Sequence, residues 1–327
     1  MNDLQKYDGL FDVIQPWGGE VPPGYRVDFL GTMTDLRFEA LWGNDPAKAA
    51  GGYLETATPF IGDSPDGNAE FWFESADWVL AATDARESFV MVTLGACFGY
   101  QAAGSYRALQ FFNAMPCKLV AIDPIPENIA MTKQHFRDNG INPDDHWLIT
   151  AAISDTNDPV FFPIGVPGTG IQNCVSTNAA GAREAYVREL IDKGGAEEAL
   201  RNLLVANSTG ITKDLLPGHD FQAEIKLVSA ITLRDILGPF DRVDYLEADI
   251  QQSEIVVFPL FIELLKKKVR RIHLGTHGQH VHWALHHMFE ANGWEIVFSY
   301  EPDSTHGSAL GTFKTNDGVL TVRNPDL

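Results

Sequence analysis

Residues 90–123 constrain the fold of this chain more than any other stretch. The apolar run Val90–Leu94 predicts a buried strand, and a second run, Leu119–Ile122, predicts another. Two glycines follow the first run and the residues between the runs are expected to form a helix, so the order is strand, glycine turn, helix, strand. A strand that returns after a helical crossover lies parallel to the first, which is the repeating unit of an α/β sheet.

The glycine turn between these runs is suited to holding a ligand. Gly95 lets the chain leave the strand sharply, and Gly99 lets backbone approach a ligand at the N-terminus of the helix. An acid at the end of the next strand can accept hydrogen bonds from two ribose hydroxyls, and Asp123 stands there. The dinucleotide fingerprint requires a third glycine, but Gly104 lies one turn too late. A tight turn without a ligand is therefore the alternative for this motif taken alone.

Strands alternate with helices from Ser88 onward, which predicts a mostly parallel sheet covered on both faces. Pro126 begins one crossover helix, and Asn139-Gly140 ends it. The expected strands are nearly continuous in apolar residues: Phe89–Leu94, Lys118–Ile122, Trp147–Ala152, Val243–Ala248, Val269–Leu274 and Trp294–Tyr300. Near the C-terminus, Asn316-Asp317-Gly318 lies between apolar runs of the segment Ala309–Val322, which predicts a hairpin turn and an antiparallel strand in the sheet.

Two segments depart from this alternation. Residues 1–85, rich in Gly, Pro, Asp and aromatic residues, are expected to be an ordered extension of loops and short elements that covers a sheet edge, caps the site or forms a subunit contact. Residues 86–327 are expected to form the ligand-binding domain. An insertion at about residues 161–225, with one helical segment, Ala182–Val205, is expected to be a lid or substrate platform, or else a surface elaboration unconnected with the site.

Composition excludes several classes of partner. The chain has 327 residues, and 24 Lys and Arg stand against 44 Asp and Glu, a formal net charge of -20. Such a surface would repel nucleic acid and anionic membranes, so neither is expected as the main partner. No apolar run approaches a membrane span, the N-terminus has no secretory pattern, and the three cysteines suggest neither a disulfide framework nor a thiolate zinc site. We therefore expect a cytoplasmic protein.

Six short segments, taken in order, carry a resemblance to a known family. They are Leu94–Gly99, Ala121–Pro124, Ala151–Asp155, Asp244–Glu254, Ile272–His277 and Asp317–Leu320. Together they resemble the FkbM-like family of S-adenosylmethionine-dependent methyltransferases, which is usually associated with O-methylation, over roughly Glu87–Asn324. The resemblance implies an α/β, Rossmann-like class I methyltransferase fold with a mostly parallel, doubly wound sheet and a C-terminal antiparallel hairpin strand.

The same resemblance implies which residues hold the cofactor, S-adenosyl-L-methionine. The glycine turn would line its methionine part, Asp123 would hold its ribose, and Ala152 and Ile153 would lie beside its adenine. The whole implied set is Thr93, Gly95, Ala96, Cys97, Gly99, Asp123, Pro124, Ala152, Ile153 and Asp249.

Two positions depart from the family pattern. Thr93 stands where an acidic residue generally helps to fix the amino group of the cofactor, and Gln252 stands where a glycine is common after the fourth strand. The first departure would weaken cofactor binding, and the second would alter the substrate mouth. A non-catalytic S-adenosylmethionine-binding scaffold therefore remains as an alternative.

Methyl transfer to a hydroxyl also requires a group that removes the hydroxyl proton, and a carboxylate or an imidazole can do this. Asp249 follows the expected strand Val243–Ala248, and His277 follows Val269–Leu274. Both side chains are therefore expected at the carboxyl ends of the strands, where ligands bind in such sheets. Either Asp249 or His277 is the predicted general base, acting on a hydroxyl of a small molecule or sugar.

A divalent metal ion is the less favoured use of these residues. Asp249 with Glu254 or His277 offers oxygen and imidazole ligands that suit magnesium or manganese, but a carboxylate at a strand end serves equally as a base or a helix cap. His282 and His286 lie four apart on an expected helix, a spacing that zinc sites use, but no Glu follows His282. We expect these two to be histidines of a solvated helix surface.

A nicotinamide-dependent dehydrogenase is the remaining alternative, because Gly95, Gly99 and Asp123 would serve that cofactor as well. The missing third glycine and the terminal hairpin count against it. The oligomeric state stays open, and a homo-oligomer is compatible with the sequence.

Overall fold

A computed structural model describes residues 4–15, 17–38, 53–54, 59, 61, 69–164 and 224–327. Its centre is a seven-stranded sheet in the order β13-β16-β12-β11-β4-β5-β6. The bounds of these strands are β4 (Phe89–Leu94), β5 (Cys117–Asp123), β6 (Trp147–Thr150), β11 (Val243–Ala248), β12 (Val269–Thr276), β13 (Glu295–Tyr300) and β16 (Gly318–Arg323). The strands from β6 to β12 pair in parallel, and β16 lies antiparallel between β12 and β13. The predicted α/β fold with a C-terminal antiparallel strand is confirmed.

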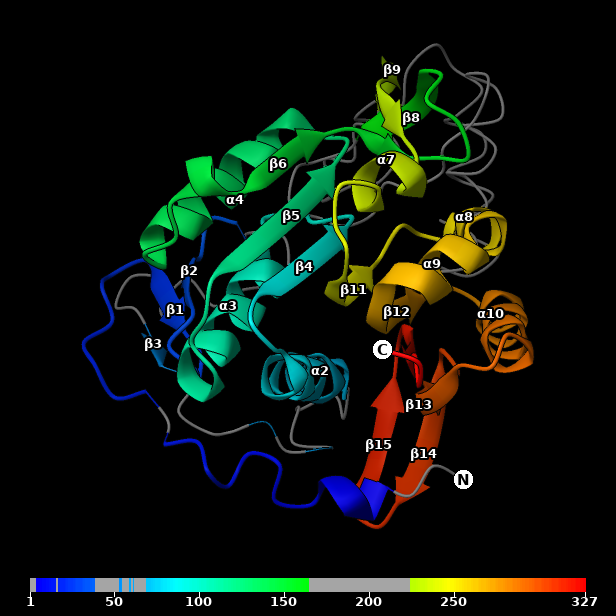
Figure 1. Ribbon diagram of the computed structural model, residues 1–327. Helices are drawn as coiled ribbons and strands as arrows, with labels where there is room; N and C mark the ends of the chain where they lie inside the picture. Colours follow the sequence, from blue (N-terminus) through cyan, green and yellow to red (C-terminus); the bar gives the residue numbers. More distant parts are fainter. Residues whose placement is uncertain are drawn as a thin grey trace, which may run out of the picture.

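Helices cover both faces of this sheet, as the sequence predicts (Figure 1). Val92 and Leu94 of β4 belong to a core cluster with residues of four helices, whereas Phe89 and Met91 belong to a cluster with residues of three others. This division follows from the alternation of side chains along a strand. The first group is α7 (Leu233–Leu237), α8 (Glu254–Leu260), α9 (Ile262–Lys268) and α10 (Gln279–Ala291), and the second is α2 (Glu70–Asp84), α3 (Tyr100–Phe112) and α4 (Pro126–Asp138).

Two strand predictions differ in detail from the structure. The expected strand Trp147–Ala152 ends at Thr150, and Ala152–Ile153 forms a separate short strand, β7, that pairs with β10 (Ala230–Ile231). The turn at Asn316-Asp317 is where it was predicted, but the strand before it, β15 (Gly311–Thr315), pairs with β14 (Ser304–Ser308) and not with β16. The antiparallel neighbours of β16 are β12 and β13.

The remaining described elements are short. They are η1 (Leu4–Tyr7), β1 (Tyr25–Val27), β2 (Met33–Asp35), β3 (Tyr53–Leu54), η2 (Pro143–Asp145), β8 (Val160–Ile164) and β9 (Glu224–Val228). The strands β8 and β9 pair in antiparallel fashion and bracket most of the expected insertion. The predicted helix Ala182–Val205 lies outside the described residues, so the insertion at 161–225 stays a prediction.

Helix α2 departs from the expectation of loops and short elements over residues 1–85. It is a 15-residue helix whose aromatic side chains, including Trp72 and Phe73, are buried. The first residues of the chain pack beside it, and the ring of Tyr7 lies 4.9 Å from that of Phe298 on the edge strand β13. Figure 1 shows η1 next to the β14–β15 arm, and Leu4 and Phe313 share one core cluster. The N-terminal segment is thus packed on the far end of the chain.

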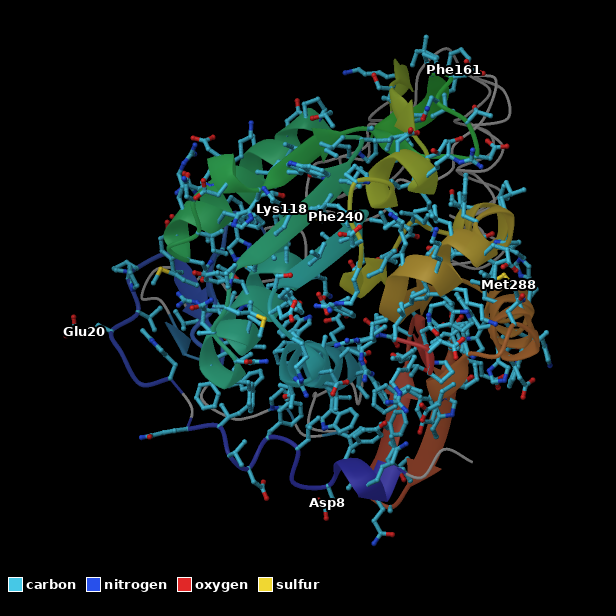
Figure 2. The ribbon with its side chains drawn as sticks, in the orientation of Figure 1. Asp8, Glu20, Lys118, Phe161, Phe240 and Met288 are labelled. Atoms are coloured by element: carbon cyan, nitrogen blue, oxygen red, sulfur yellow. The ribbon has the colours of Figure 1, made fainter. Side chains whose placement is uncertain are left out.

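The amino ends of the parallel strands are closed by side chains. The ring of Trp147 lies 4.9 Å from that of Phe240, and the Nζ atom of Lys118 lies 5.7 Å from the Trp147 ring centre. Figure 2 shows Lys118 and Phe240 near one another beside the sheet. The carboxyl ends of β4, β5, β11 and β12 lie at the opposite edge, where ligands bind in sheets of this kind. None of the helices in the described part of the chain is long and apolar enough to cross a membrane.

Candidate active site

The glycine turn at the end of β4 is held tightly by its neighbours. Gly95 has a φ of 82°, and a Cβ atom there would lie 2.0 Å from the backbone oxygen of Asp249. Gly99 has a φ of 78°, and its Cβ atom would lie 2.6 Å from Cγ2 of Thr132 in α4. Both positions therefore require glycine. The space beside Gly99 is filled by α4. The structure therefore requires glycine here because of the close contact with Thr132, whereas the sequence analysis attributed the glycine to the close approach of a ligand.

Asp123, the last residue of β5, lies beside this turn as predicted. Its Oδ2 accepts a hydrogen bond from the backbone N–H of Cys97 at 2.9 Å. Its Oδ1 accepts from the N–H of Ile125 at 2.8 Å and from Nδ2 of Asn128 at 3.1 Å. Burial raises the pKa of Asp123 to about 7, although these three donors act against the rise. A carboxylate oxygen can accept two hydrogen bonds, so Oδ2 can also accept a hydroxyl.

Cys97 and Ala96 complete the turn. Cys97 has a φ of 48° and intermediate exposure, and its carbonyl oxygen accepts a hydrogen bond from Oγ1 of Thr132 at 3.1 Å. The N–H groups of Gly95 and Ala96 both donate to the carbonyl oxygen of Ile122 at 2.9 Å. The turn is therefore fixed to β5 immediately before Asp123.

The predicted adenine neighbours, Ala152 and Ile153, form β7, the short strand that follows β6 in the chain. The N–H of Ala151 donates to the carbonyl oxygen of Asp123 at 3.1 Å, which places β7 next to Asp123. Ala152 and Ile153 are both buried, the first against Ile125 and the second in the main core. Pro124 lies between Asp123 and Ile125 with intermediate exposure. Pro124 and β7 therefore both lie next to Asp123, at the carboxyl end of β5.

Thr93, which was expected to stand in place of an acidic residue, has an acid beside it. Its hydroxyl donates a hydrogen bond to Oε2 of Glu247, the residue opposite it on β11. Both side chains are buried. Burial raises the pKa of Glu247 well above its ordinary value, and the Thr93 hydroxyl opposes this rise. Sequence reasoning missed Glu247, because the signal is a single acid inside an otherwise apolar strand.

Asp249 and His277 come together at the carboxyl edge, as predicted. Oδ1 of Asp249 lies 3.7 Å from Nε2 of His277, and Oδ1 of Asp317, at the turn before β16, lies 3.4 Å from the same nitrogen. Burial alone would lower the pKa of His277, but Asp249, Asp317 and Glu254 outweigh it and raise the pKa to about 9. Sequence analysis placed Asp317 only in a turn and did not connect it with the site.

Glu254, the first residue of α8, lies close to Asp249 and His277. Its side chain is fully buried, and its Oε1 accepts a hydrogen bond from the N–H of Ile250 at 2.7 Å. Burial raises the pKa of Glu254 to about 7, and the nearby His277 acts in the opposite direction. Ligand atoms of Asp249, Glu254 and His277 all lie within 4.8 Å of one another. We refer to these three residues as the acid–histidine cluster.

The turn that carries Asp249 has an uncommon backbone. Gln251 and Gln252 have φ values of 53° and 70°, a region that side-chain-bearing residues seldom adopt. Nε2 of Gln251 donates to Oδ1 of Asp249 at 2.9 Å. Gln252, expected to stand in place of a glycine, therefore strains the backbone, because a glycine would adopt this φ without cost.

Helix α2 also contributes acids to the carboxyl edge. Oε1 of Glu70 accepts a hydrogen bond from the N–H of Asp317 at 2.8 Å. Burial raises the pKa of Glu74 to about 7, with Asp249 among the charges that act on it. Sequence reasoning missed both acids. The signal was their spacing, because Glu70, Glu74 and Asp77 share one face of a helix.

One histidine expectation is wrong. His282 is fully buried, between Oγ1 of Thr276 at 3.0 Å and Oγ of Ser299 at 3.0 Å, and is not part of a solvated surface. Burial lowers its pKa to about 4. His286 shares Ser299 at 2.8 Å. The reason is that α10 packs on β12 and β13, so its histidine-bearing face reaches serine and threonine hydroxyls of the sheet.

Comparisons with known proteins assign the chain to a family. A model of the methyltransferase FkbM domain matches residues 94–294. This range includes the glycine turn, Asp123 and the whole acid–histidine cluster. The match, with a strand-end acid beside a glycine turn, defines an S-adenosylmethionine-dependent methyltransferase. The chain belongs to the FkbM methyltransferase family.

Several solved structures share features of the fold at low identity. An O-methyltransferase from Bacillus cereus in complex with SAH is 8% identical, with 79% of this chain and 84% of that chain covered and a TM-score of 0.36. A precorrin-6y C5,15-methyltransferase from Geobacter metallireducens is 8% identical, with coverage of 82% and 98% and a TM-score of 0.38. Fibrillarin from Aeropyrum pernix, in complex with S-adenosyl-L-methionine, is 10% identical, with coverage of 77% and 76% and a TM-score of 0.34. No curated protein matches the chain.

The residues present fit S-adenosylmethionine. Asp123 is held by three donors and its Oδ2 can accept a ribose hydroxyl. The carboxyl edge carries the acids Glu247 and Asp249, which suit a ligand with a positive sulfonium and an ammonium group.

Proposed function

We propose that this methyltransferase transfers its methyl group to a hydroxyl oxygen of a small molecule or sugar. One observation carries the proposal: a carboxylate and an imidazole, Asp249 and His277, meet at the ends of two strands directly beside the glycine turn. Transfer to a hydroxyl must remove a proton. The Asp249 carboxylate can receive it, whereas His277, whose pKa is raised to about 9, already holds its own proton near neutral pH.

When bound, S-adenosylmethionine supplies a methyl group on a positively charged sulfur. Asp123 would hold the ribose of the cofactor. Asp249 would accept the hydroxyl proton as the acceptor oxygen takes the methyl group that the cofactor supplies, and the electron pair of the broken carbon–sulfur bond would stay with sulfur. Asp249 is the base because its side chain is 43% exposed and can meet an acceptor, whereas that of His277 is 5% exposed. His277 positions the Asp249 carboxylate.

The proposal extends to the organisation of the chain and its partners. Residues 86–327 carry every residue of this site except the acids of α2, which supports their assignment as the methyltransferase domain. The net charge of -20 supports a small-molecule acceptor and not a nucleic acid or an anionic membrane. The three cysteines, whose number and spacing suggest no disulfide framework, support a cytoplasmic location.

Calorimetric titration with S-adenosylhomocysteine tests the cofactor site. The full chain should bind it, and Asp123→Ala should weaken binding at least about tenfold, because a buried hydrogen bond to the ribose is lost. Asp144→Asn, an exposed acid at the amino edge, is the control and should bind like the wild type. Binding of NAD in place of S-adenosylhomocysteine would contradict the proposal.

A second experiment tests oxygen as the acceptor atom. Turnover is followed as S-adenosylhomocysteine formed with matched panels of alcohols, sugars, phenols, amines and thiols. Hydroxyl acceptors should support turnover, and Asp249→Asn should lower kcat about 10²-fold or more, a larger factor than the factor by which it weakens binding of S-adenosylhomocysteine. Turnover confined to amines or thiols would show that the acceptor atom is not oxygen.

A further inference from the structure

The acid–histidine cluster contains buried polar atoms whose needs the protein does not meet. Among the described residues, Oε2 of Glu254 has no hydrogen-bond partner, and neither do Nδ1 and Nε2 of His277. Glu254 is fully buried, and His277 is 6% exposed. Buried polar side-chain atoms in native proteins nearly always have a partner. Nε2 of His277 has ion-pair contacts, but among the described residues Oε2 of Glu254 and Nδ1 of His277 have neither a hydrogen bond nor an ion pair, which indicates a missing ligand.

Ion pairing within the protein does not supply that ligand. A protonated His277 would present two N–H donors, yet neither of its nitrogens makes a hydrogen bond with a described residue. Its Nε2 lies 3.7 Å from Asp249 and 3.4 Å from Asp317, which are contact distances of ion pairs and not of well-formed hydrogen bonds. The Oε2 atom of Glu254 would still lack a partner.

We propose that Asp249, Glu254 and His277 bind one divalent cation of the manganese or magnesium class. Their ligand atoms come from the turn after β11, the start of α8 and the end of β12, and all lie within 4.8 Å of one another. Two carboxylates and one imidazole form a set that suits Mn²⁺ well, because carboxylate oxygens suit hard cations and the imidazole nitrogen suits transition metals.

The surroundings of the cluster support this assignment. Asp249 is the partly exposed member, with a side chain 43% exposed, so an ion can enter from that side and keep positions for water or an acceptor oxygen. Gln251 holds the Asp249 carboxylate by a hydrogen bond of 2.9 Å, and the N–H of Ile250 holds Glu254 at 2.7 Å. These contacts orient the ligands, as partners of metal ligands commonly do.

The catalytic role of the ion rests on the proposed function, whereas its binding does not. A cation at the ends of β11 and β12 would lower the pKa of an acceptor hydroxyl that coordinates it. The hydroxyl proton would then pass to Asp317 or to water, and the oxygen would form its bond to the methyl carbon as the carbon–sulfur bond breaks. With the ion bound, Asp249 would act as its ligand, and the ion would take over from Asp249 the activation of the acceptor hydroxyl.

Titration with Mn²⁺, followed by the electron paramagnetic resonance of the free ion, tests the site. The full chain is first freed of metal with EDTA, and the titration is made at physiological ionic strength without cofactor or acceptor, so that weak binding to the acidic surface is screened. The wild type should bind one Mn²⁺ per chain in the micromolar range or tighter. Asp249→Asn, Glu254→Gln and His277→Gln should each weaken binding at least about tenfold.

Matched controls are available on α10. Glu290→Gln and His287→Gln remove an exposed acid and an exposed histidine, and each should leave Mn²⁺ binding unchanged. Circular dichroism checks folding, and Asp249→Asn keeps the test decisive where a buried substitution fails to fold, because its side chain is partly exposed. Absence of saturable binding in the wild type, or binding that Asp249→Asn leaves unchanged, overturns the proposal.

The ion site and the proposed function fail independently. Methylation of hydroxyl acceptors by a chain that binds no Mn²⁺ overturns the ion site and leaves the proposed function. One Mn²⁺ per chain, lost in Asp249→Asn, in a chain that methylates only amines or thiols overturns the proposed function and leaves the ion site.

Discussion

At the scale of single residues, the turn after β11 holds Asp249 in place with a strained backbone. Gln251 and Gln252 both lie in the left-handed region, which costs an L-residue about 1–2 kcal/mol. The turn persists because its ends are fixed: the N–H of Asp249 donates to the carbonyl oxygen of Leu94 at 3.0 Å, and Glu254 accepts from Ile250. A strained turn that holds an exposed carboxylate is characteristic of functional sites.

Gln252→Gly should therefore stabilise the fold. Glycine removes the left-handed strain at φ 70° but gains entropy in the unfolded chain, and the net rise in the free energy of unfolding should be about 0.5–1 kcal/mol. Urea denaturation measures it. The control is Gln110→Gly, at an exposed position inside α3, where the helical backbone favours glutamine and stability should fall by about 0.5–1 kcal/mol. Equal losses in both variants would show that the turn carries no strain.

At the scale of elements, helix α2 is tied to the sheet by buried charge. Asp77 accepts hydrogen bonds from Arg271 at 3.1 Å and from Thr321 at 2.6 Å, and it lies 2.8 Å from Nδ1 of His273. All four side chains are buried. Burial lowers the pKa of His273, but Asp77 outweighs this effect and raises it. The network joins α2 to β12, which ends just before His277, and to β16, which begins just after Asp317.

Asp77→Ala should destabilise the protein by about 3–5 kcal/mol, because it leaves the Arg271 guanidinium buried and without its main counter-charge. Asp84→Ala is a matched control on the same helix. Asp84 lies 3.6 Å from the same guanidinium, but its side chain is 44% exposed, so its loss should cost less than about 1 kcal/mol. Chemical denaturation compares the two. Similar values for both variants would mean that Asp77 is not the principal partner of Arg271.

The elements that the sequence predicted are those whose patterns arise locally. The strands β4, β5, β11 and β12 are apolar runs because helices cover both of their faces, and such runs are visible without knowledge of the fold. Helix α2 was missed because Trp72, Phe73, Trp78 and Val79 are buried around most of its circumference, between the sheet and the N-terminal segment, which removes the 3.6-residue period. The pairing of β15 with β14 was missed because the packing of Phe313 against distant aromatic residues decides it.

At the scale of the whole molecule, the same distinction separates the predicted from the missed site residues. Asp123, Asp249 and His277 follow predictable parallel strands, so their meeting at one edge could be foreseen. Asp317 and Glu70 reach that edge only because α2 and the turn before β16 pack beside it, and their contact joins residues 247 positions apart. No local pattern carries such information.

A buried histidine joins the N-terminal segment to the glycine turn after β4. Nδ1 of His135 in α4 lies 3.0 Å from the carbonyl oxygen of Phe98, and its Nε2 lies 3.3 Å from Oγ1 of Thr34 in β2. His135 is fully buried, and burial lowers its pKa from 6.5 to about 4. The folded protein thus holds this imidazole neutral while the unfolded chain protonates it readily, so one residue couples the packing of β2 on the core to pH.

The sign of this coupling follows from the depressed pKa. The contribution of His135 to stability is complete above pH 6.5 and is lost as the pH falls toward 4, because the unfolded chain binds the extra proton. Between pH 7 and pH 5 the loss should be about 2 kcal/mol. Other groups titrate over the same range, and the buried carboxyls with raised pKa values act in the opposite direction, so the wild type alone does not isolate this term.

The difference between the wild type and His135→Gln isolates it. Glutamine keeps a polar side chain but binds no proton, so the stability advantage of the wild type over this variant should shrink by about 2 kcal/mol between pH 7 and pH 5. Urea denaturation at both pH values gives the four free energies required. His287→Gln, which removes an exposed histidine, should show no such change. A wild-type advantage that is equal at pH 7 and pH 5 would mean that His135 has the same pKa in the folded and the unfolded chain, and that the N-terminal segment leaves it open to solvent.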